Sequence, residues 1–279
     1  MKAWQSGDVI ANGVRLHYTR TGDGRKPPLV LAHGVSDDGL CWTPVAAALA
    51  PDYDVIMVDA RGHGRSEAPP SGYGPLDQAA DLAGVIAALE LRKPVVLGHS
   101  MGAMTTLTLA GAYPDLPRAI VLEDPPGWWL PDPMLTSERA LQMRAWIAGL
   151  KRKSREALIA EQRAQTPHWS EAELGPWADA KLRVSEHVLD VFNPATPHQV
   201  EWSSLLRRVT CPALLLTADP ALGAILMPDG AAALQALVPQ LRVAHVPGAG
   251  HNIRRDQFER FLAAVREFLA ELHNGGHQD

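Results

Sequence analysis

Ser100 lies in the segment Gly98-His99-Ser100-Met101-Gly102, which matches the pattern Gly-x-Ser-x-Gly. The apolar run at 94–97 is typical of a buried strand, and the small residues at 103–112 after the pattern favour a helix. A sharp strand-to-helix turn requires close approach of the two elements, which glycine permits, and it exposes the residue at the turn. The pattern therefore predicts that Ser100 is a nucleophile at the top of a sheet.

A serine hydroxyl is a weak nucleophile near neutral pH, so this chemistry needs a base, an orienting acid and donors for a developing oxyanion. His251 ends the glycine-rich segment Pro247-Gly248-Ala249-Gly250-His251, which follows the last predicted strand. Such a loop can bring an imidazole over Ser100. Because the pKa of free histidine is near neutrality, His251 could accept the serine proton and return it to a leaving group.

The elements around these residues alternate between strand and helix. Residues 8–10 and 15–18 flank Asn12-Gly13, a pair that suits a type I′ turn and predicts a β-hairpin. The alternation that follows predicts an α/β fold with a mostly parallel sheet. Strands are predicted at 29–32, 55–58, 95–97, 119–122, 213–217 and 241–246, and helices between them at 43–49 and 76–91.

The alternation stops at 127–206, a stretch with helical patterns at 138–150 and 155–163 and with Ser170 and Glu173 spaced as a capping box. An aromatic-rich insertion between two strands predicts a cap over the site; the alternative is that the aromatic side chains only pack the helices on the sheet. We expect both ends of the insertion to emerge at the carboxyl edge. It holds six of the eight tryptophans, at positions 128, 129, 146, 169, 177 and 202.

Length and composition narrow the function classes. The 279 residues fit one domain with an insertion, and the net charge of −5 argues against nucleic acid as a partner. The polar amino terminus and the lack of a long apolar run predict a soluble, cytoplasmic protein without membrane insertion. Cys41 and Cys211 are expected to be buried and unpaired, and the histidines lack metal-ligand spacing, so neither a metal nor a cofactor is predicted.

Two further motifs follow predicted strands: His33-Gly34 after 29–32 and Asp59-Ala60-Arg61-Gly62-His63-Gly64-Arg65-Ser66 after 55–58. With the serine motif and the late histidine, the sequence resembles the α/β-hydrolase fold superfamily over nearly its whole length. The resemblance implies a mostly parallel eight-stranded sheet flanked by helices. It also implies a core of 1–126 and 207–279, a helical cap of 127–206, and structural roles for His63 and His99.

The orienting acid is left open by the resemblance. In most similar proteins it follows the strand after the cap, where this chain has Ala221, with Asp219 two residues earlier. Zearalenone lactonases and certain dehalogenases carry it after the preceding strand, which here ends in Glu123-Asp124. Asp124 stands 24 residues after Ser100, as in such a lactonase. We therefore expect Asp124, with Asp219 and Glu123 as alternatives; strand alternation points Glu123 and Asp124 in opposite directions.

Two backbone N–H groups are expected to form the oxyanion hole. Met101, the residue after the nucleophile, supplies one, and Val35 in the loop after the strand at 29–32 supplies the other. The substrate pocket is expected to include His33 and Gly34 from the same loop, and Trp128 and Trp129 from the tryptophan-rich insertion.

The resemblance implies a hydrolase, and a serine nucleophile argues against epoxide hydrolases and haloalkane dehalogenases, which need a carboxylate. The expected activity is hydrolysis of a small apolar carboxylic ester or lactone through an acyl-enzyme on Ser100. Alternatives are carbon–carbon bond hydrolysis, perhydrolysis or acyl transfer by the same residues, and a lactone-sensing protein without turnover.

Overall fold

The computed structural model describes residues 4–130, 137–192 and 200–274, and these form one eight-stranded sheet in the order β1-β2-β4-β3-β5-β6-β7-β8. Strands β1 (Gln5–Ala11) and β2 (Val14–Arg20) form the predicted hairpin. Asn12 and Gly13 between them have φ angles of 49° and 75°, as a type I′ turn requires. β2 also pairs antiparallel with β4, whereas β3 to β8 pair in parallel.

The strands and helices predicted from apolar patterns are present, with small shifts of their ends. The helix predicted at 76–91 ends at Ala88, because Glu90 adopts a left-handed backbone with φ of 53°. The elements are β3 (Pro28–Ala32), η1 (Gly39–Trp42), α1 (Thr43–Leu49), β4 (Asp54–Val58), α2 (Pro75–Ala88), β5 (Val95–His99), α3 (Met101–Ala112), β6 (Ala119–Glu123), β7 (Ala213–Thr217), η3 (Pro220–Leu222), α8 (Pro228–Leu237), β8 (Leu241–His245), α9 (Ile253–Asp256) and α10 (Phe258–Asn274).

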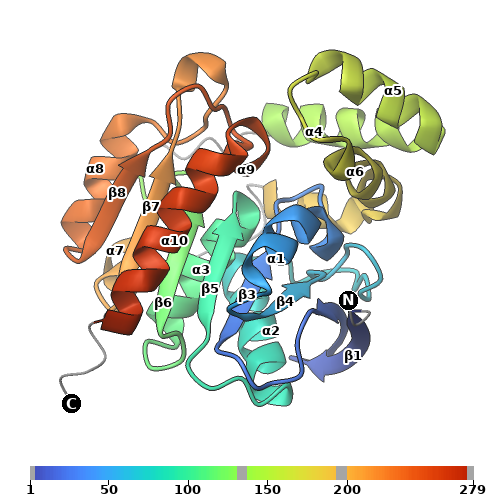
Figure 1. Cartoon of the computed structure of the whole chain (residues 1–279). Helices are drawn as coiled ribbons and strands as arrows, with labels where there is room; N and C mark the ends of the chain where they lie inside the picture. Colours follow the sequence, from blue (N-terminus) through green and yellow to red (C-terminus); the bar gives the residue numbers. More distant parts are fainter. Residues whose placement is uncertain (1–3, 131–136, 193–199, 275–279) are drawn as a thin grey trace.

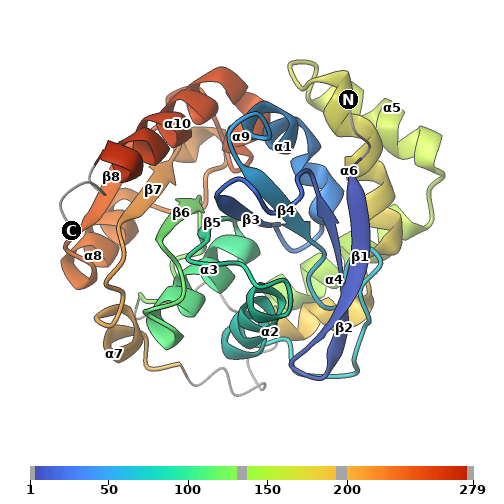
Figure 2. The ribbon, with the colours of Figure 1, turned by 60° about the horizontal axis from the view of Figure 1, so that its bottom comes forward.

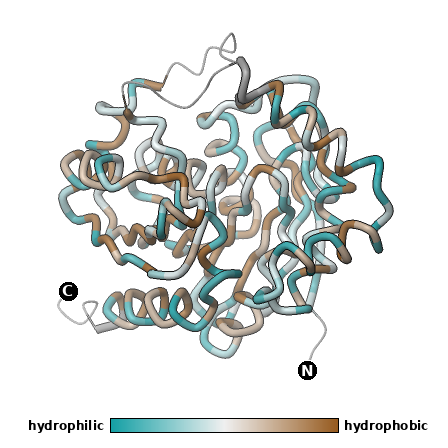
Figure 3. The backbone as a smooth tube through the Cα atoms, turned by 90° about the horizontal axis from the view of Figure 1, so that it is seen from above, coloured by the Kyte–Doolittle hydropathy of each residue, from teal (hydrophilic) through white to brown (hydrophobic). Residues whose placement is uncertain are grey.

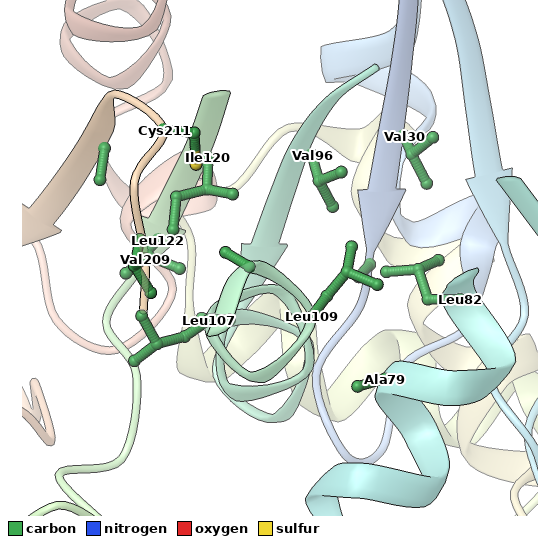
Figure 4. Close-up of a cluster of buried hydrophobic side chains, with 14 of the residues drawn as sticks. Val30, Ala79, Leu82, Val96, Leu107, Leu109, Ile120, Leu122, Val209 and Cys211 are labelled. Carbon is green, nitrogen blue, oxygen red and sulfur yellow. The ribbon is translucent and has the colours of Figure 1, made fainter. Parts of the chain in front are cut away.

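Helices cover both faces of the sheet, with α1 and α10 on one side and α2, α3 and α8 on the other (Figure 2). The strands β4, β5 and β6 are buried along their whole length, which explains why they are continuous apolar runs without polar alternation. Figure 4 shows one of the two main cores, where Leu82 from α2 and Leu107 from α3 lie beside Val30, Val96 and Ile120 from the strands.

The hydropathy of the chain follows this layering. Brown, apolar segments lie in the interior of the molecule, and the helix that leads to the carboxyl terminus alternates between polar and apolar turns (Figure 3). In that helix, α10, Phe261, Leu262, Val265, Phe268 and Leu269 are buried against the sheet.

The segment between β6 and β7 forms α4 (Ser137–Lys151), α5 (Arg155–Gln165), α6 (Glu171–Arg183), η2 (Glu186–Phe192) and α7 (Trp202–Leu206). Helices α4, α5 and α6 lie together at one end of the molecule, apart from the sheet, while α7 lies on the opposite side next to α8 (Figure 1). The predicted cap at 127–206 includes 131–136 and 193–199, which lie outside the described residues, and its status as a unit stays a prediction.

The expectation that both ends of this insertion emerge at the carboxyl edge is wrong for its exit. Because β6 and β7 are parallel, the amino-terminal end of β7 lies on the side of the sheet opposite to the carboxyl-terminal end of β6. Helix α7 accordingly packs near the carboxyl-terminal end of α3, where a Cβ on Gly111 would lie 2.6 Å from the Leu205 carbonyl oxygen.

The predicted capping box at the start of α6 is half correct. The Ser170 hydroxyl accepts a hydrogen bond from the Ala172 N–H at 3.3 Å, so Ser170 does cap the helix. Glu173 does not complete the box, because its buried carboxylate accepts from Arg255 Nε at 3.0 Å instead.

Two helical glycines offer a matched test of how closely α3 approaches β3. A Cβ on Gly102 would lie 2.2 Å from the Ala32 carbonyl oxygen, whereas a Cβ on Gly149 in α4 would meet no atom within 4 Å. We expect Gly102→Ala to lower the free energy of unfolding by about 3 kcal/mol through overpacking. Gly149→Ala should raise it by about 0.5–1 kcal/mol. Urea unfolding of both variants checks this; similar midpoints for the two would contradict the close packing at Gly102.

Candidate active site

Ser100 occupies a strained turn between β5 and α3. Its φ and ψ angles are 53° and −115°, a combination that costs energy for any residue with a side chain. The turn is held from both sides, since the Ser100 N–H donates to the Glu123 carbonyl at 2.9 Å and its own carbonyl accepts from the Met104 N–H at 3.1 Å. Ser100 is one of the residues that line a cavity between the core and the inserted helices.

The Asp124 carboxylate contacts His251 as the sequence predicted. Asp124 Oδ2 lies 2.7 Å from His251 Nδ1, within hydrogen-bond distance. Asp124 is fully buried, and its carboxylate also accepts hydrogen bonds from the Ile225 and Leu226 N–H groups at 2.9 and 3.0 Å. Its backbone is left-handed, with φ of 41°, which turns the side chain out of the strand direction at the end of β6.

The two alternative acids bind elsewhere. Asp219 contacts His245 Nε2 at 2.9 Å and accepts from the Gly248 N–H at 2.7 Å, so it braces the loop that leads to His251. Glu123 is buried and accepts from the backbone N–H and from Nη1 of Arg254 at 2.9 and 3.1 Å. Burial raises the pKa of Glu123, although Arg254 opposes that shift.

His99 is buried beside the nucleophile and contacts the other histidine of the site. Its Nε2 donates to the His251 carbonyl at 2.9 Å, and the two rings lie 4.7 Å apart between centroids. Burial, with Arg254 and His251 nearby, holds the pKa of His99 well below the usual value, so the ring is neutral. Among the described residues, His99 Nδ1 has no hydrogen-bond partner.

The loop after β3 is fixed by two more buried histidines, His33 and His63. His33 Nε2 accepts from the Ala60 N–H at 3.0 Å, which leaves Nδ1 to donate to the Gly34 carbonyl at 2.8 Å. Burial, followed by the nearby His63, lowers the pKa of His33 to about 3. His63 Nε2 contacts the Val35 carbonyl at 2.7 Å. Both rings brace the loop that carries Val35.

The cavity next to Ser100 has a volume of about 770 Å³ and is lined by the core and by the inserted helices. Of the predicted pocket residues, Gly34 and Trp128 line it, as do Val35 and Met101. His33 and Trp129 do not. His33 lies behind the loop, and Trp129 turns away to donate from Nε1 to the Gly230 carbonyl at 3.0 Å. Three tryptophans of α4 to α6 and the loop between them also line the cavity: Trp146, Trp169 and Trp177.

A cluster of buried charges forms part of the cavity wall, and the sequence analysis did not predict it. Asp37 Oδ1 accepts from Lys181 Nζ at 2.7 Å, and Asp37 Oδ2 lies 3.0 Å from a terminal nitrogen of both Arg254 and Arg255. Burial alone would raise the pKa of Asp37, but Arg255, Lys181 and Arg254 outweigh it and hold that pKa well below the usual value. Arg255 also pairs with Glu173.

The sequence carries only faint signals for this cluster. Lys181 and Arg255 line the cavity, yet each lies on a short stretch with ordinary surface-like composition. Those signals are the doublet Arg254-Arg255, which begins three residues after the candidate base His251, and the doublet Asp37-Asp38, which begins four residues after His33. Charged residues are almost never fully buried without partners, so such pairs can be found only once their contacts are known.

Cys41 and Cys211 are buried and unpaired, as predicted, and burial raises the pKa of both thiols, that of Cys211 to about 11. Within residues 4–130, 137–192 and 200–274, no group of three or more histidine, cysteine or acidic side chains could hold a metal ion. In the same part of the chain, no helix combines the length and apolar character needed to cross a membrane.

Comparison with known proteins finds relatives of similar length. The chain is 34% identical to N-formylmaleamate deformylase from Pseudomonas putida strain KT2440, over 94% of this chain and 96% of the relative. It is 29% identical to 2-(acetamidomethylene)succinate hydrolase from Mesorhizobium japonicum, over 92% of each. A crystal structure of E-2-(acetamidomethylene)succinate hydrolase superposes with a TM-score of 0.80 at 24% identity, covering 96% of this chain and all of the other.

The sequence profile described as the alpha/beta hydrolase fold matches residues 27–254, which span most of the chain from β3 to the helix after the candidate base. The eight-stranded sheet, its mostly parallel order and the flanking helices agree with that match. The chain therefore belongs to the alpha/beta hydrolase fold family.

Proposed function

We propose that the protein is a serine hydrolase that cleaves a carboxylic ester or lactone through an acyl-enzyme on Ser100. The observation that carries the proposal is the 2.7 Å contact between His251 Nδ1 and the buried Asp124 carboxylate, at a cavity that Ser100 also lines. Asp124 fixes the ring orientation and leaves Nε2 free to act as the base. This division of roles is the one that serine hydrolysis requires.

In the proposed mechanism, Ser100 Oγ attacks the acyl carbon while its proton passes to His251 Nε2. The resulting oxyanion accepts hydrogen bonds from the Val35 and Met101 N–H groups, and Met101 begins helix α3, whose dipole adds positive charge there. The leaving group takes the proton from His251. A water molecule, activated by the same histidine, then hydrolyses the acyl-enzyme.

The cavity wall supports an uncharged substrate. Its cationic side chains are already paired, Lys181 with Asp37 and Arg255 with Asp37 and Glu173, so they offer little net charge to an anionic group. The tryptophans of the inserted segment present apolar surface to the same space. We therefore expect neutral esters or lactones with apolar or aryl groups to be preferred.

Cleavage of an acyl–nitrogen bond is a second candidate function. It is favoured by the names of the two full-length relatives, a deformylase and a hydrolase of an acetamido compound. The same residues could perform it, with His251 protonating the departing nitrogen. The residues alone do not distinguish an oxygen from a nitrogen leaving group, because the nucleophile, base and oxyanion donors act on the acyl carbon in both reactions.

A substrate screen separates these functions. We expect Ser100-dependent, repeated turnover of p-nitrophenyl esters or lactones, faster than turnover of N-formyl and N-acetyl amides or of esters that carry a free carboxylate. Ser100→Ala should abolish turnover of all these substrates. Faster cleavage of the amides would favour the second function. A single burst without recycling would instead indicate a lactone-sensing protein.

The role of Asp124 is tested by comparing it with Asp219, the alternative acid. Asp124→Asn should lower kcat by about 10⁴-fold, because the histidine loses the partner that fixes its tautomer. Asparagine tolerates the left-handed backbone at this position, so the fold should persist. Asp219→Asn should cost less than about tenfold, since Asp219 binds the loop and not the imidazole. Steady-state ester hydrolysis measures both; equal losses would remove the assignment.

The two adjacent tryptophans test the cavity wall. Trp128 lines the cavity, whereas Trp129 packs toward Gly230 and the sheet. Trp128→Ala should shift the KM values and the preference across a series of acyl chain lengths. Trp129→Ala should lower the free energy of unfolding by about 1–3 kcal/mol and leave that preference unchanged. An unaltered preference in both variants would mean that substrate does not contact this wall.

A further inference from the structure

The loop that carries Val35 has each of three successive carbonyl groups held by a neighbour. The Gly34 carbonyl accepts from His33 Nδ1 and from the Asp37 N–H at 3.0 Å, and the Val35 carbonyl contacts His63. The Ser36 carbonyl accepts from Lys181 Nζ at 2.9 Å. The partners of the Gly34 and Val35 carbonyl groups belong to the core, whereas Lys181, the partner of the Ser36 carbonyl, belongs to α6 in the inserted segment.

These contacts form a path from Lys181 to the N–H of Val35. In a planar trans peptide the C=O and N–H bonds point in opposite directions, so fixing one fixes the other. Lys181 holds the Ser36 carbonyl and thereby orients the Asp37 N–H, which donates to the Gly34 carbonyl. Gly34 and Val35 share a peptide group, so the Gly34 carbonyl in turn orients the Val35 N–H.

Neutralising Asp37 does not by itself require Lys181. Two guanidinium groups, from Arg254 and Arg255, each lie 3.0 Å from Asp37 Oδ2. Lys181 is the cation that also reaches the Ser36 carbonyl, and its ammonium group is buried, with the ring of Trp177 5.0 Å away. A buried ammonium is costly unless its donors find acceptors, so both contacts on this loop are needed to keep Lys181 in place.

We propose that Lys181 is a positioning residue for the oxyanion donor Val35, an inference that rests on the proposed serine hydrolysis. Helix α6 then supplies more than a wall of the cavity. Its packing against the core sets the direction of a backbone N–H group that stabilises the transition state. Loss of one oxyanion donor costs on the order of 10²–10³ in turnover, and misorientation of Val35 should cost part of that.

The test compares a transition-state analogue with the substrate in the Lys181→Met variant. The serine oxygen adds to the boron of phenylboronic acid and gives a tetrahedral boronate. One oxygen of the boronate then occupies the position where the oxyanion forms. We expect kcat for a p-nitrophenyl ester to fall by about 10–100-fold and the inhibition constant of the boronic acid to rise by a similar factor. KM should change less than about twofold, because the ground-state ester does not use the donor fully.

Two variants serve as controls. Arg155→Met breaks a solvent-accessible ion pair with Asp179 between α5 and α6 that makes no contact with the loop of Val35, and it should leave kcat and the inhibition constant unchanged. Lys181→Arg keeps a cation and a donor and should recover part of the boronic acid affinity. If Lys181→Met does not fold, as judged by far-UV circular dichroism, Lys181→Leu, which also lacks a donor, is measured against the same criterion.

A lower melting temperature in Lys181→Met with unchanged kcat and boronic acid affinity would overturn the inference, since Lys181 would then only stabilise the fold. The proposed function is tested separately by the unmodified protein. Failure of that protein to bind phenylboronic acid, or binding that survives Ser100→Ala, would reject the serine mechanism itself, whatever the variants of Lys181 show.

Discussion

Asp124 is a carboxylate without access to solvent, and an ion in such a place must find N–H donors or destabilise the fold by several kcal/mol. Its donors come from segments that are distant in sequence: His251 after β8, and Ile225 and Leu226 after β7. The need to satisfy this one group therefore draws both segments to the end of β6. The Ser100 N–H donates to the Glu123 carbonyl at the same strand end. The candidate nucleophile and the candidate base are therefore both held by residues at the end of β6.

The neighbouring acid, Glu123, extends this order behind the site. Glu123, the last residue of β6, faces Arg254, whereas Asp124 lies one residue beyond the strand, where its left-handed backbone turns the side chain toward His251. Arg254 also donates a hydrogen bond to Asp37, and Asp37 accepts another from Lys181 in α6. A buried network of this kind contributes little net stability, but each member restricts where the others can lie. It ties the inserted helices, the loop of Val35 and the loop of His251 to one arrangement.

The sequence predicts local features of the site well and long-range ones poorly. The buried strands are apolar runs, and the candidates Ser100 and His251 follow from motifs, whereas spacing favours Asp124 but leaves Asp219 and Glu123 as alternatives until the contact of Asp124 with His251 is known. Trp128 and Trp129 could not be separated, because their directions depend on partners about 100 residues away, such as Gly230. The pairing of Glu173 with Arg255 was likewise hidden, since a helix-capping pattern and a buried ion pair use the same residue type.

The path of the chain between β6 and β7 limits how the inserted segment can be exchanged between relatives. It leaves the sheet at the carboxyl edge and returns through α7, which lies at the other edge beside the end of α3. The two edges are separated by the length of a five-residue strand, about 17 Å. A graft that replaced only α4 to α6 would preserve this crossing. A graft that also removed α7 would have to span the full height of the sheet with new sequence.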